Sequence, residues 1–468
     1  MRPHLARALT LVFALVLATA AALAAVRLTQ VRPNVLLITI DTLRADHLSC
    51  YGYRRPTTPA LDRLAAEGAR FTNAMSSGSW TPPALFSLAT GAQANQHRVI
   101  GWSDRMNPEL GTVAEALAGA GYRTALFNNH SVFFNVQREI TYGFREVDSL
   151  SDGEFPAARL VDRTIDWLGR KESGPFFLWV HFFDPHAPFA APAPYNALFW
   201  EGGQGDGARR AQPVEGGFGA GGIPEHIYRA AGFEDRIERL IAAYDGEIAY
   251  TDAHLERLLD ALDQLGLAAD TLVLVTADHG EILERADTPY HGTVYFSHGT
   301  YLFQELLAVP LLVRYPARLR KGVTVEEPVG LIDVAPTLLE LAGIEPTPAM
   351  VGRSLLPLMG LTHREPSGPP PPLLSEELRN NWRSLRWGGY KLIDYGHDGH
   401  TPYDLDRDPG ETRDLSREQP AVAAALGAQL LRLSRLSGAG PLVKHGDDGD
   451  GRLDAETLRK LRALGYTQ

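Results

Sequence analysis

Three polar residues from two distant parts of the sequence have the chemistry of a metal site. Asp41, and the adjacent pair Asp278 and His279, each follow a short apolar run. Two carboxylates and an imidazole form a donor set that suits a divalent cation, particularly where a sheet holds their backbone rigid. Neighbouring residues reach the same ion only where the chain turns sharply, and Gly280 permits such a turn. We therefore expect Asp41, Asp278 and His279 to bind one cation.

Thr81 could add a nucleophile to this site. It precedes Pro82 and Pro83, which favour the first turn of a helix extending to about Leu88. The amides and partial positive charge of a helix N-terminus stabilise an anionic oxygen, and a bound metal lowers the pKa of a hydroxyl much further. Thr81 would then be activated without a separate base. The alternative is that Thr81 only caps the helix, a role that suits threonine.

The elements that would position these residues indicate an α/β fold. Short apolar runs alternate with helical patterns, which is typical of strands buried on both faces of a mostly parallel sheet. The runs are 35–40, 124–127, 176–182, 272–276 and 309–315. A helix is predicted at 58–67, and either one long helix or two in tandem at 235–265. Ligands of such sheets bind beyond the carboxyl ends of the strands. The polar residues expected at that edge are Asp41, His181, Asp184, His186, Asp278 and His279.

Two irregular stretches divide the chain. The glycine-rich stretch 201–222 has no periodicity and is interpreted as a surface insertion that could lie near a substrate opening. The proline-rich stretch 366–372 predicts a stiff linker. A catalytic domain over 32–365 would therefore precede a small α+β subdomain over 373–468. Short strands at 383–387, 390–395 and 402–405 and a helix at 421–433 are expected in that subdomain.

Composition restricts the class of partner. The chain has 468 residues, of which 44% are hydrophobic, so it can bury a large core. The formal net charge is −11 and there is no dense block of lysine and arginine, which argues against binding nucleic acid. A small anionic ester substrate would need local positive charge from a metal or from histidines.

The N-terminus predicts export. Arg2 and Arg7 precede an apolar run over 8–26, which describes either a cleaved signal peptide or a membrane anchor within residues 1–30. The protein would then be periplasmic, or attached to the outer face of the inner membrane with possible membrane association through this segment. Cys50 is the only cysteine, so no internal disulfide can form.

Several motifs in the same order resemble the bacterial sulfatase family, within the alkaline phosphatase superfamily. They include NVLLITIDTLRADHLSCYGY from Asn34, TPPALFSLATG from Thr81, FFLWVHFFDPHAPF from Phe176, YDGEIAYTD from Tyr244 and TADHGE from Thr276. The resemblance implies an alkaline phosphatase-like α/β/α sandwich around a mostly parallel sheet, with a small C-terminal subdomain. It also implies metal-assisted attack on a sulfate or phosphate ester, with the cation at Asp41, Thr81, Asp278 and His279. Thr81 stands at the nucleophile position, and His186 and His298 would face the ester as further catalytic residues.

The sequence departs from the family where the nucleophile is made. Family sulfatases convert a cysteine or serine in Cys/Ser-x-Pro-x-Arg to formylglycine, whereas this frame reads Thr81-Pro82-Pro83-Ala84-Leu85. Formylglycine is therefore not expected, and the usual arginine is replaced by Leu85. The family's Gly-Lys-x-His segment is replaced by residues 128–131, NNHS. A threonine ester cannot eliminate to an aldehyde, so water must hydrolyse it or an acceptor must take the group.

We expect an exported, metal-dependent hydrolase of sulfate or phosphate esters, with a preference for phosphoester chemistry. One divalent ion is expected, Ca²⁺, Mn²⁺ or Zn²⁺, and the imidazole of His279 favours Mn²⁺ or Zn²⁺. A second ion at Asp184, His186 and His298 is the alternative to direct substrate contact by these residues. Two other functions remain open: transfer of a phospho-substituent to an envelope acceptor, and ligand binding without catalysis.

Overall fold

The computed structural model describes residues 32–150, 156–200, 209–215, 220–232, 234–362, 368–436, 455–457 and 459. The predicted signal peptide or anchor over 1–30 lies outside the described residues. None of the described helices is long and apolar enough to cross a membrane.

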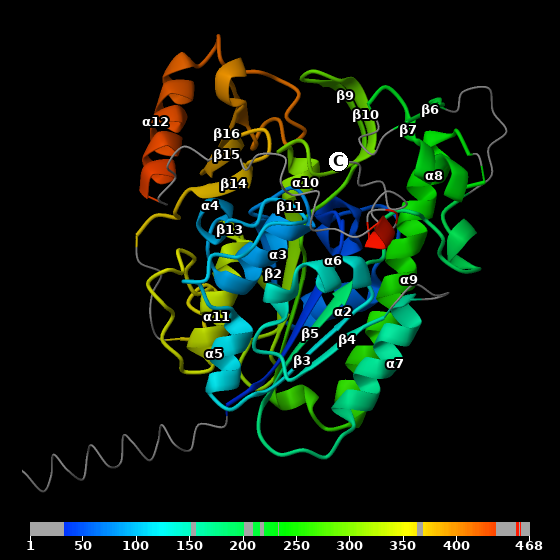
Figure 1. The fold of residues 1–468 in the computed structure, drawn as a ribbon, viewed down its shortest axis with the longest axis vertical. Coiled ribbons are helices and arrows are strands. Elements are labelled where there is room, and N and C mark those ends of the chain that lie inside the picture. Colours follow the sequence, from blue (N-terminus) through cyan, green and yellow to red (C-terminus); the bar gives the residue numbers. More distant parts are fainter. Residues whose placement is uncertain are drawn as a thin grey trace, which may run out of the picture. The chain divides into compact units, whose positions relative to one another are not determined.

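A large mixed sheet forms the centre of the fold (Figure 1). Its strands are β1 (Asn34–Ile40), β2 (Ala69–Met75), β3 (Arg123–Asn128), β4 (Glu146–Ser149), β5 (Phe176–Phe182), β8 (Thr271–Ala277), β11 (Ala308–Arg314), β12 (Val323–Val325) and β13 (Val329–Gly330). The order is β12-β2-β11-β8-β1-β5-β3-β4, with β13 also paired to β2. All five predicted strands are present.

The strands that carry the site are parallel and buried on both faces. β1 lies between β5 and β8 and is parallel to both. Every residue of β5 and β8 is buried, which explains their uninterrupted apolar sequences. β11 runs antiparallel to β8 and β2, so the sheet is mostly rather than wholly parallel.

Helices cover both faces of the sheet and complete an α/β/α sandwich (Figure 1). On one side, α3 (Thr81–Thr90), α5 (Val113–Gly119) and α11 (Val334–Leu341) contact one another. On the other side, α9 (Ile237–Gln264) contacts α2 (Pro59–Glu67) and α7 (Pro156–Leu168). The pattern predicted over 235–265 is therefore one continuous helix. Shorter helices are α4 (Ala94–His97), α6 (Ser131–Val136), α8 (Glu225–Ala230) and α10 (Gln304–Leu307).

A second, antiparallel sheet lies near the C-terminus of the chain. It consists of β14 (Leu373–Glu377), β15 (Trp382–Trp387), β16 (Tyr390–Asp394) and β17 (His400–Asp404). Residues of one face pack against α12 (Pro420–Leu436), while Leu373, Trp382 and Ile393 share a core with Ile282 and Leu306 of the larger part. The predicted α+β composition is confirmed, and the proposed boundary at 366–372 stays a prediction.

Two small two-stranded pairs, one antiparallel and one parallel, lie outside these sheets. β9 (Ile282–Thr288) and β10 (Gly292–Ser297) form an antiparallel pair, and β6 (Pro213–Val214) pairs with β7 (Ile223–Pro224). The end of the predicted insertion contacts this region, since the amide of Gly221 donates to the carbonyl of Thr293. Residues 201–208 and 216–219 of the insertion lie outside the described residues.

Candidate metal centre and active site

The register of the sheet brings Asp41 and Asp278 together. Ile40 of β1 lies opposite Ala277 of β8, so the residues that follow these two strands emerge side by side. Asp278 and Asp41 are both fully buried. The backbone amide of Asp41 donates to the carbonyl of Phe182 at 2.8 Å, which extends the ladder with β5 by one residue. The carboxylates are thus fixed by the rigid centre of the sheet.

The chain leaves β1 through a strained residue. Thr42 has φ of +53°, a left-handed conformation that is rare for a β-branched side chain. Tyr244 of α9 supports this turn, because its hydroxyl donates to the carbonyl of Thr42 at 2.7 Å and accepts from the amide of Arg44 at 3.1 Å. Strain of this kind persists only where the surroundings enforce it, and it is typical of functional sites.

The imidazole of His279 is oriented as a metal ligand. Its Nδ1 lies 2.8 Å from the carbonyl oxygen of Gly280. A carbonyl can only accept, so Nδ1 carries the proton and Nε2 keeps its lone pair. Burial first, and then the neighbouring histidines, hold the pKa of His279 well below its usual value. This imidazole is therefore neutral, as metal binding requires.

Three oxygen atoms surround the free lone pair of His279. Nε2 lies 3.3 Å from Thr81 Oγ1, 3.4 Å from Asp41 Oδ1 and 3.5 Å from Asp278 Oδ2. Four tetrahedral ligands at about 2.1 Å from one ion are about 3.4 Å from each other. The predicted residues thus have the spacing that a single small divalent cation needs.

The carboxylates have no positive partner among the described residues. Neither oxygen of Asp41 accepts a hydrogen bond, and the same holds for Oδ2 of Asp278. The pKa of Asp41 is raised well above its usual value, mainly by burial and then by repulsion from Asp278 and Glu281. Burial also raises the pKa of Asp278 to about 7. Two buried acids with unsatisfied oxygens are costly unless a cation neutralises them, so these residues fit a bound metal ion.

Thr81 is not the N-cap of its helix. Trp80 occupies the N-cap position of α3 and Thr81 is the first helical residue, with its side chain fully buried. No side-chain capping bond is made there, and the hydroxyl instead faces Nε2 of His279. The geometry therefore disfavours the alternative in which Thr81 serves only as a cap.

Gly280 is needed for a different reason from the one predicted. Its φ is not positive, so no left-handed turn occurs at this residue. Its amide donates to the carbonyl of Leu306 at 2.8 Å, and a Cβ atom would lie only 2.0 Å from the carbonyl oxygen of Glu305. The segment after His279 thus packs directly on the α10 backbone, which leaves no room for a side chain.

His186 and His298 lie next to the metal ligands. The ring centroid of His298 is 4.9 Å from that of His279 and 4.9 Å from that of His186. Nδ1 of His298 is 3.0 Å from Oε2 of Glu281, whose side chain is 3% exposed. Glu281 therefore orients the His298 ring, although its role was not recognised from the sequence. The final residue of the TADHGE motif was the available signal.

His181 and Asp184 do not join this group. His181 lies inside β5 rather than after it, and its Nδ1 is 2.8 Å from Thr39 Oγ1. Asp184 accepts from the side chain of Asn129 at 2.7 Å. Across the described part of the chain, the triad Asp41, Asp278 and His279 is the one group with ligand atoms close enough to hold an ion. A second ion at Asp184, His186 and His298 thus finds no support in the geometry.

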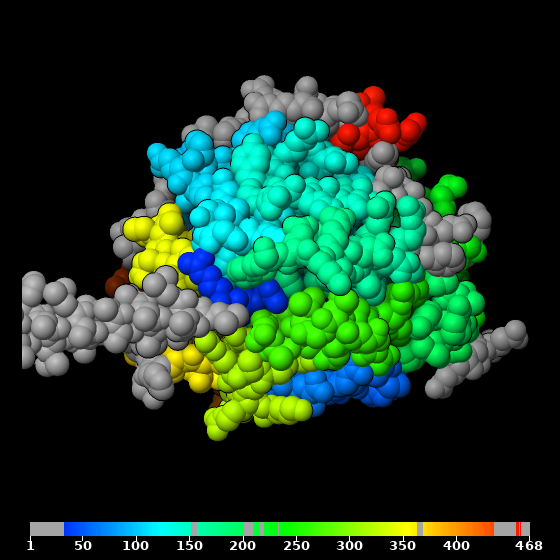
Figure 2. Space-filling view, turned by 90° about the horizontal axis from the view of Figure 1, so that it is seen from below, coloured from blue at the N-terminus to red at the C-terminus, as the bar shows by residue number. Residues whose placement is uncertain are grey.

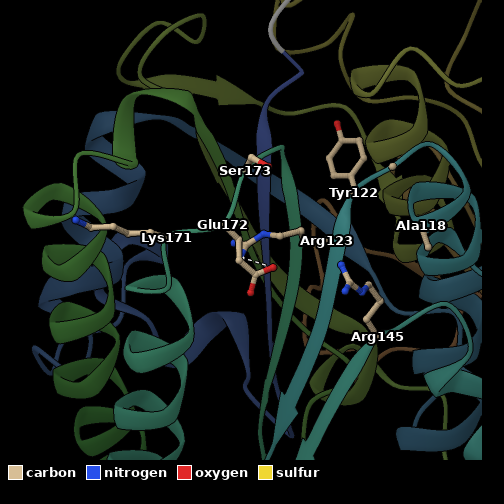
Figure 3. Close-up of a pocket in the computed structure, with 8 residues that line it drawn as sticks. Ala118, Tyr122, Arg123, Arg145, Lys171, Glu172 and Ser173 are labelled. Carbon is tan, nitrogen blue, oxygen red and sulfur yellow. Dashed lines mark ion pairs between the residues drawn. The ribbon is translucent and has the colours of Figure 1, made fainter.

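A surface pocket of about 560 Å³ lies at the opposite edge of the sheet, where β3 and β5 begin. Figure 2 views the molecule from this side, with the first described residues in dark blue. Figure 3 shows Arg123 turned toward Glu172, with which it pairs at 3.3 Å, while Lys171 extends away from both. The basic side chains do not converge, and the pocket is remote from the triad because the parallel strands end at the other edge.

Comparison with known proteins identifies the family. The sequence model described as Sulfatase matches residues 33–344, which is about two thirds of the chain. The chain belongs to the sulfatase family. It is therefore an ester hydrolase of a metal-dependent family, and the triad is a possible metal-binding site of this sulfatase.

Relatives with different activities share this fold. The multifunctional alkaline phosphatase superfamily protein PehA of Trinickia caryophylli is 29% identical over 407 residues, covering 70% of this chain and 77% of PehA. An arylsulfatase of Clostridium perfringens is 25% identical over 467 residues, covering 82% of this chain and 90% of the relative. The phosphonate monoester hydrolase of Agrobacterium radiobacter has a TM-score of 0.71 at 23% identity, covering 87% and 96% of the two chains. These likenesses confirm the alkaline phosphatase-like fold.

Proposed function

We propose that this sulfatase-family protein hydrolyses sulfate or phosphate esters with Thr81 as its nucleophile, and without formylglycine. The observation that carries the proposal is the 3.3 Å approach of Thr81 Oγ1 to Nε2 of His279, beside the clustered ligand atoms of Asp41, Asp278 and His279. Cys50 does not compete for the role. Its amide donates a hydrogen bond to Asp62, and the pKa of its thiol is raised to about 12, mainly by burial.

The metal centre would hold one divalent ion through Asp41, Asp278, His279 and Thr81. When bound, the ion supplies Lewis acidity that lowers the pKa of a hydroxyl and neutralises ester oxygens. The imidazole donor and the short ligand spacing favour Mn²⁺ or Zn²⁺ over Ca²⁺, which takes six to eight oxygen ligands at longer distances. The N-terminus of α3 adds partial positive charge beside the attacking oxygen.

The chemistry would proceed in two displacements. In the first, Thr81 Oγ1 forms a bond to phosphorus or sulfur while the bond to the departing alcohol oxygen breaks, and that oxygen takes a proton. In the second, water attacks the threonine ester and restores the hydroxyl. His298 is placed to move the proton in both steps, since its ring lies 4.9 Å from that of His279 and Glu281 binds its Nδ1. His186 would contact the ester oxygens.

Charge in the site favours esters that carry one negative charge. None of the ion pairs among the described residues joins arginine or lysine to Asp41 or Asp278. Burial is the main reason that the pKa values of His186 and His279 lie well below the usual value, so both rings are neutral. A phosphate monoester would bring two negative charges into a site where the metal only balances its own ligands. We therefore expect phosphodiesters, phosphonate monoesters and sulfate monoesters to be preferred.

The test uses purified protein reconstituted with Mn²⁺ or Zn²⁺ and a panel of aryl esters that differ only in the acid. Thr81→Ala should lower turnover at least about a thousandfold while metal content is retained. Thr90→Ala is the matched control, because that hydroxyl lies on the same helix and bonds to the carbonyl of Phe86. Mass spectrometry of quenched wild-type enzyme should find the transferred group on the peptide containing Thr81. Full turnover by Thr81→Ala would remove Thr81 from the mechanism.

We also propose that the protein is exported, on the basis of Arg2, Arg7 and the apolar run over 8–26. Expression of the full chain followed by separation of periplasm, membrane and cytoplasm tests this. Recovery in the periplasm supports a cleaved signal peptide, and recovery with the membrane supports an anchor. Retention of the mature activity in the cytoplasm would contradict export.

A further inference from the structure

The segments that carry Thr81 and His298 are joined just outside the metal centre. The amide of Gly299, next to His298, donates to the carbonyl of Ser79 at 2.8 Å. The indole of Trp80, next to Thr81, is 3% exposed. A Cβ atom on Gly299 would lie 3.3 Å from the Cβ of Trp80. The relative position of the two reactive side chains therefore depends on this junction.

Arg379, in the turn between β14 and β15, covers the junction. Its guanidinium carbon lies 3.9 Å from the centroid of the Trp80 ring, and its Nη2 donates to the carbonyl of Gly299. Its Nε donates to the buried carboxylate of Glu377 at 2.7 Å. One planar side chain thus stacks on the residue before Thr81 and hydrogen-bonds the residue after His298. Lysine cannot reproduce both contacts from a single ammonium group.

The C-terminal sheet, which carries Arg379, is bonded to the segment that leads into α3. The amide of Glu376 donates to the carbonyl of Ser77 at 2.9 Å, and the hydroxyl of Ser375 donates to the carbonyl of Ser76 at 2.6 Å. The edge strand β14 therefore runs directly against the segment that leads into α3. These contacts join the second sheet to the segment that precedes Thr81.

We propose that Arg379 is a positioning residue for ester hydrolysis, fixing Thr81 through Trp80 and His298 through Gly299. This inference rests on the proposed roles of Thr81 and His298. Arg379 touches neither the metal ligands nor, in this account, the substrate. Its loss would let the nucleophile and the proton-transferring ring move relative to each other, and a misplacement of about 1 Å costs about a hundredfold in rate.

The experiment compares Arg379→Ala, Arg379→Lys and Arg413→Ala in the full-length, metal-loaded enzyme. Arg413 is the matched control, because it forms an exposed ion pair with Glu418 in the same C-terminal part of the chain. We expect Arg379→Ala to lower kcat about 10- to 100-fold with KM and metal content nearly unchanged. Arg413→Ala should behave as wild type in both parameters.

Chemical rescue separates positioning from folding. The Arg379 side chain is 36% exposed, so free guanidinium ion can enter the space that the alanine variant leaves. Millimolar guanidinium should restore part of the kcat of Arg379→Ala, while urea at the same concentration should not. If the alanine variant does not fold, Arg379→Lys carries the test, since it keeps the charge beside Glu377 and should still lose several-fold in kcat.

Three results would overturn the inference. The first is a wild-type kcat in Arg379→Ala or Arg379→Lys. The second is a rise in KM alone, which would make Arg379 a substrate ligand. The third is a loss of kcat that only follows the loss of folded protein. An active Thr81→Ala enzyme would instead contradict the proposed function. The two failures are therefore distinguishable.

Discussion

Replacing Tyr244 by phenylalanine tests how the metal centre is held from outside. The Tyr244 hydroxyl is buried and makes two hydrogen bonds, to the carbonyl of Thr42 and from the amide of Arg44. Both partners belong to the turn that follows Asp41. Tyr244→Phe removes no apolar packing, so its effect isolates these two bonds.

The expected loss of stability follows from the groups left behind. Each hydrogen bond contributes about 1 kcal/mol, and an unsatisfied buried carbonyl adds to this cost, so we expect about 2 to 3 kcal/mol in total. Metal affinity should fall about tenfold, because Thr42 loses a contact that maintains its strained backbone and Asp41 then loses its orientation. Urea denaturation of the apo protein and metal titration followed by calorimetry measure the two effects separately.

Tyr250→Phe is the control for this prediction. Tyr250 lies on the same helix and is 3% exposed, and its hydroxyl has no hydrogen-bond partner among the described residues. This variant should change stability by less than about 0.5 kcal/mol and leave metal affinity unchanged. The reasoning is refuted if Tyr244→Phe loses stability but binds the metal within twofold of wild type. In that case the turn after Asp41 is held by other contacts.

Three further predictions concern burial and charge. Lys391→Met should destabilise the protein by about 3 to 5 kcal/mol in urea denaturation, because Glu411 loses its buried partner at 2.6 Å, and the double variant with Glu411→Leu should recover most of that loss. Burial raises the pKa of Asp252 to about 7 from 3.8, so the folded protein holds this proton more tightly than the unfolded chain and stability falls as the pH rises from about 4 to about 7. Asp252→Asn should remove that component from a series of denaturation curves measured across this range. Added Mn²⁺ or Zn²⁺ should raise the Tm of the wild type and not that of Asp278→Asn, and an equal rise in both proteins would place the ion elsewhere.

The candidate metal ligands could be predicted from the sequence because their positions follow from a local rule. An apolar run predicts a buried strand, neighbouring parallel strands end at the same edge, and the residues after β1 and β8 must therefore meet. No knowledge of loops is needed for this step. The same rule was wrong for His181, because the histidine lies within the predicted run 176–182, which is also the extent of β5, rather than after it. The imidazole of His181 can remain within a buried strand because it forms a hydrogen bond with the hydroxyl of Thr39.

The positioning residues could not be predicted because they act across long separations. Glu281 reaches His298 through the β9–β10 pair, and Arg379 reaches Trp80 from a different sheet. Neither contact leaves a periodic pattern in the sequence. Tyr244 falls within the helix predicted over 235–265, and its ring is buried in the core. The hydrogen bonds of its hydroxyl depend on the path of the turn after β1.

The features that suit this site to binding a metal are also those that would weaken the apo protein. Asp41 and Asp278 are buried with oxygens that accept no hydrogen bond from the described residues, and Thr42 adopts a backbone conformation that its side chain disfavours. A fold selected for stability alone would replace at least one of these residues with an apolar or conformationally suited one. Their presence together is explained if metal binding supplies the missing free energy. On this view Tyr244 and Arg379 hold the site in shape before the ion arrives, so that the ion meets ligands already in place.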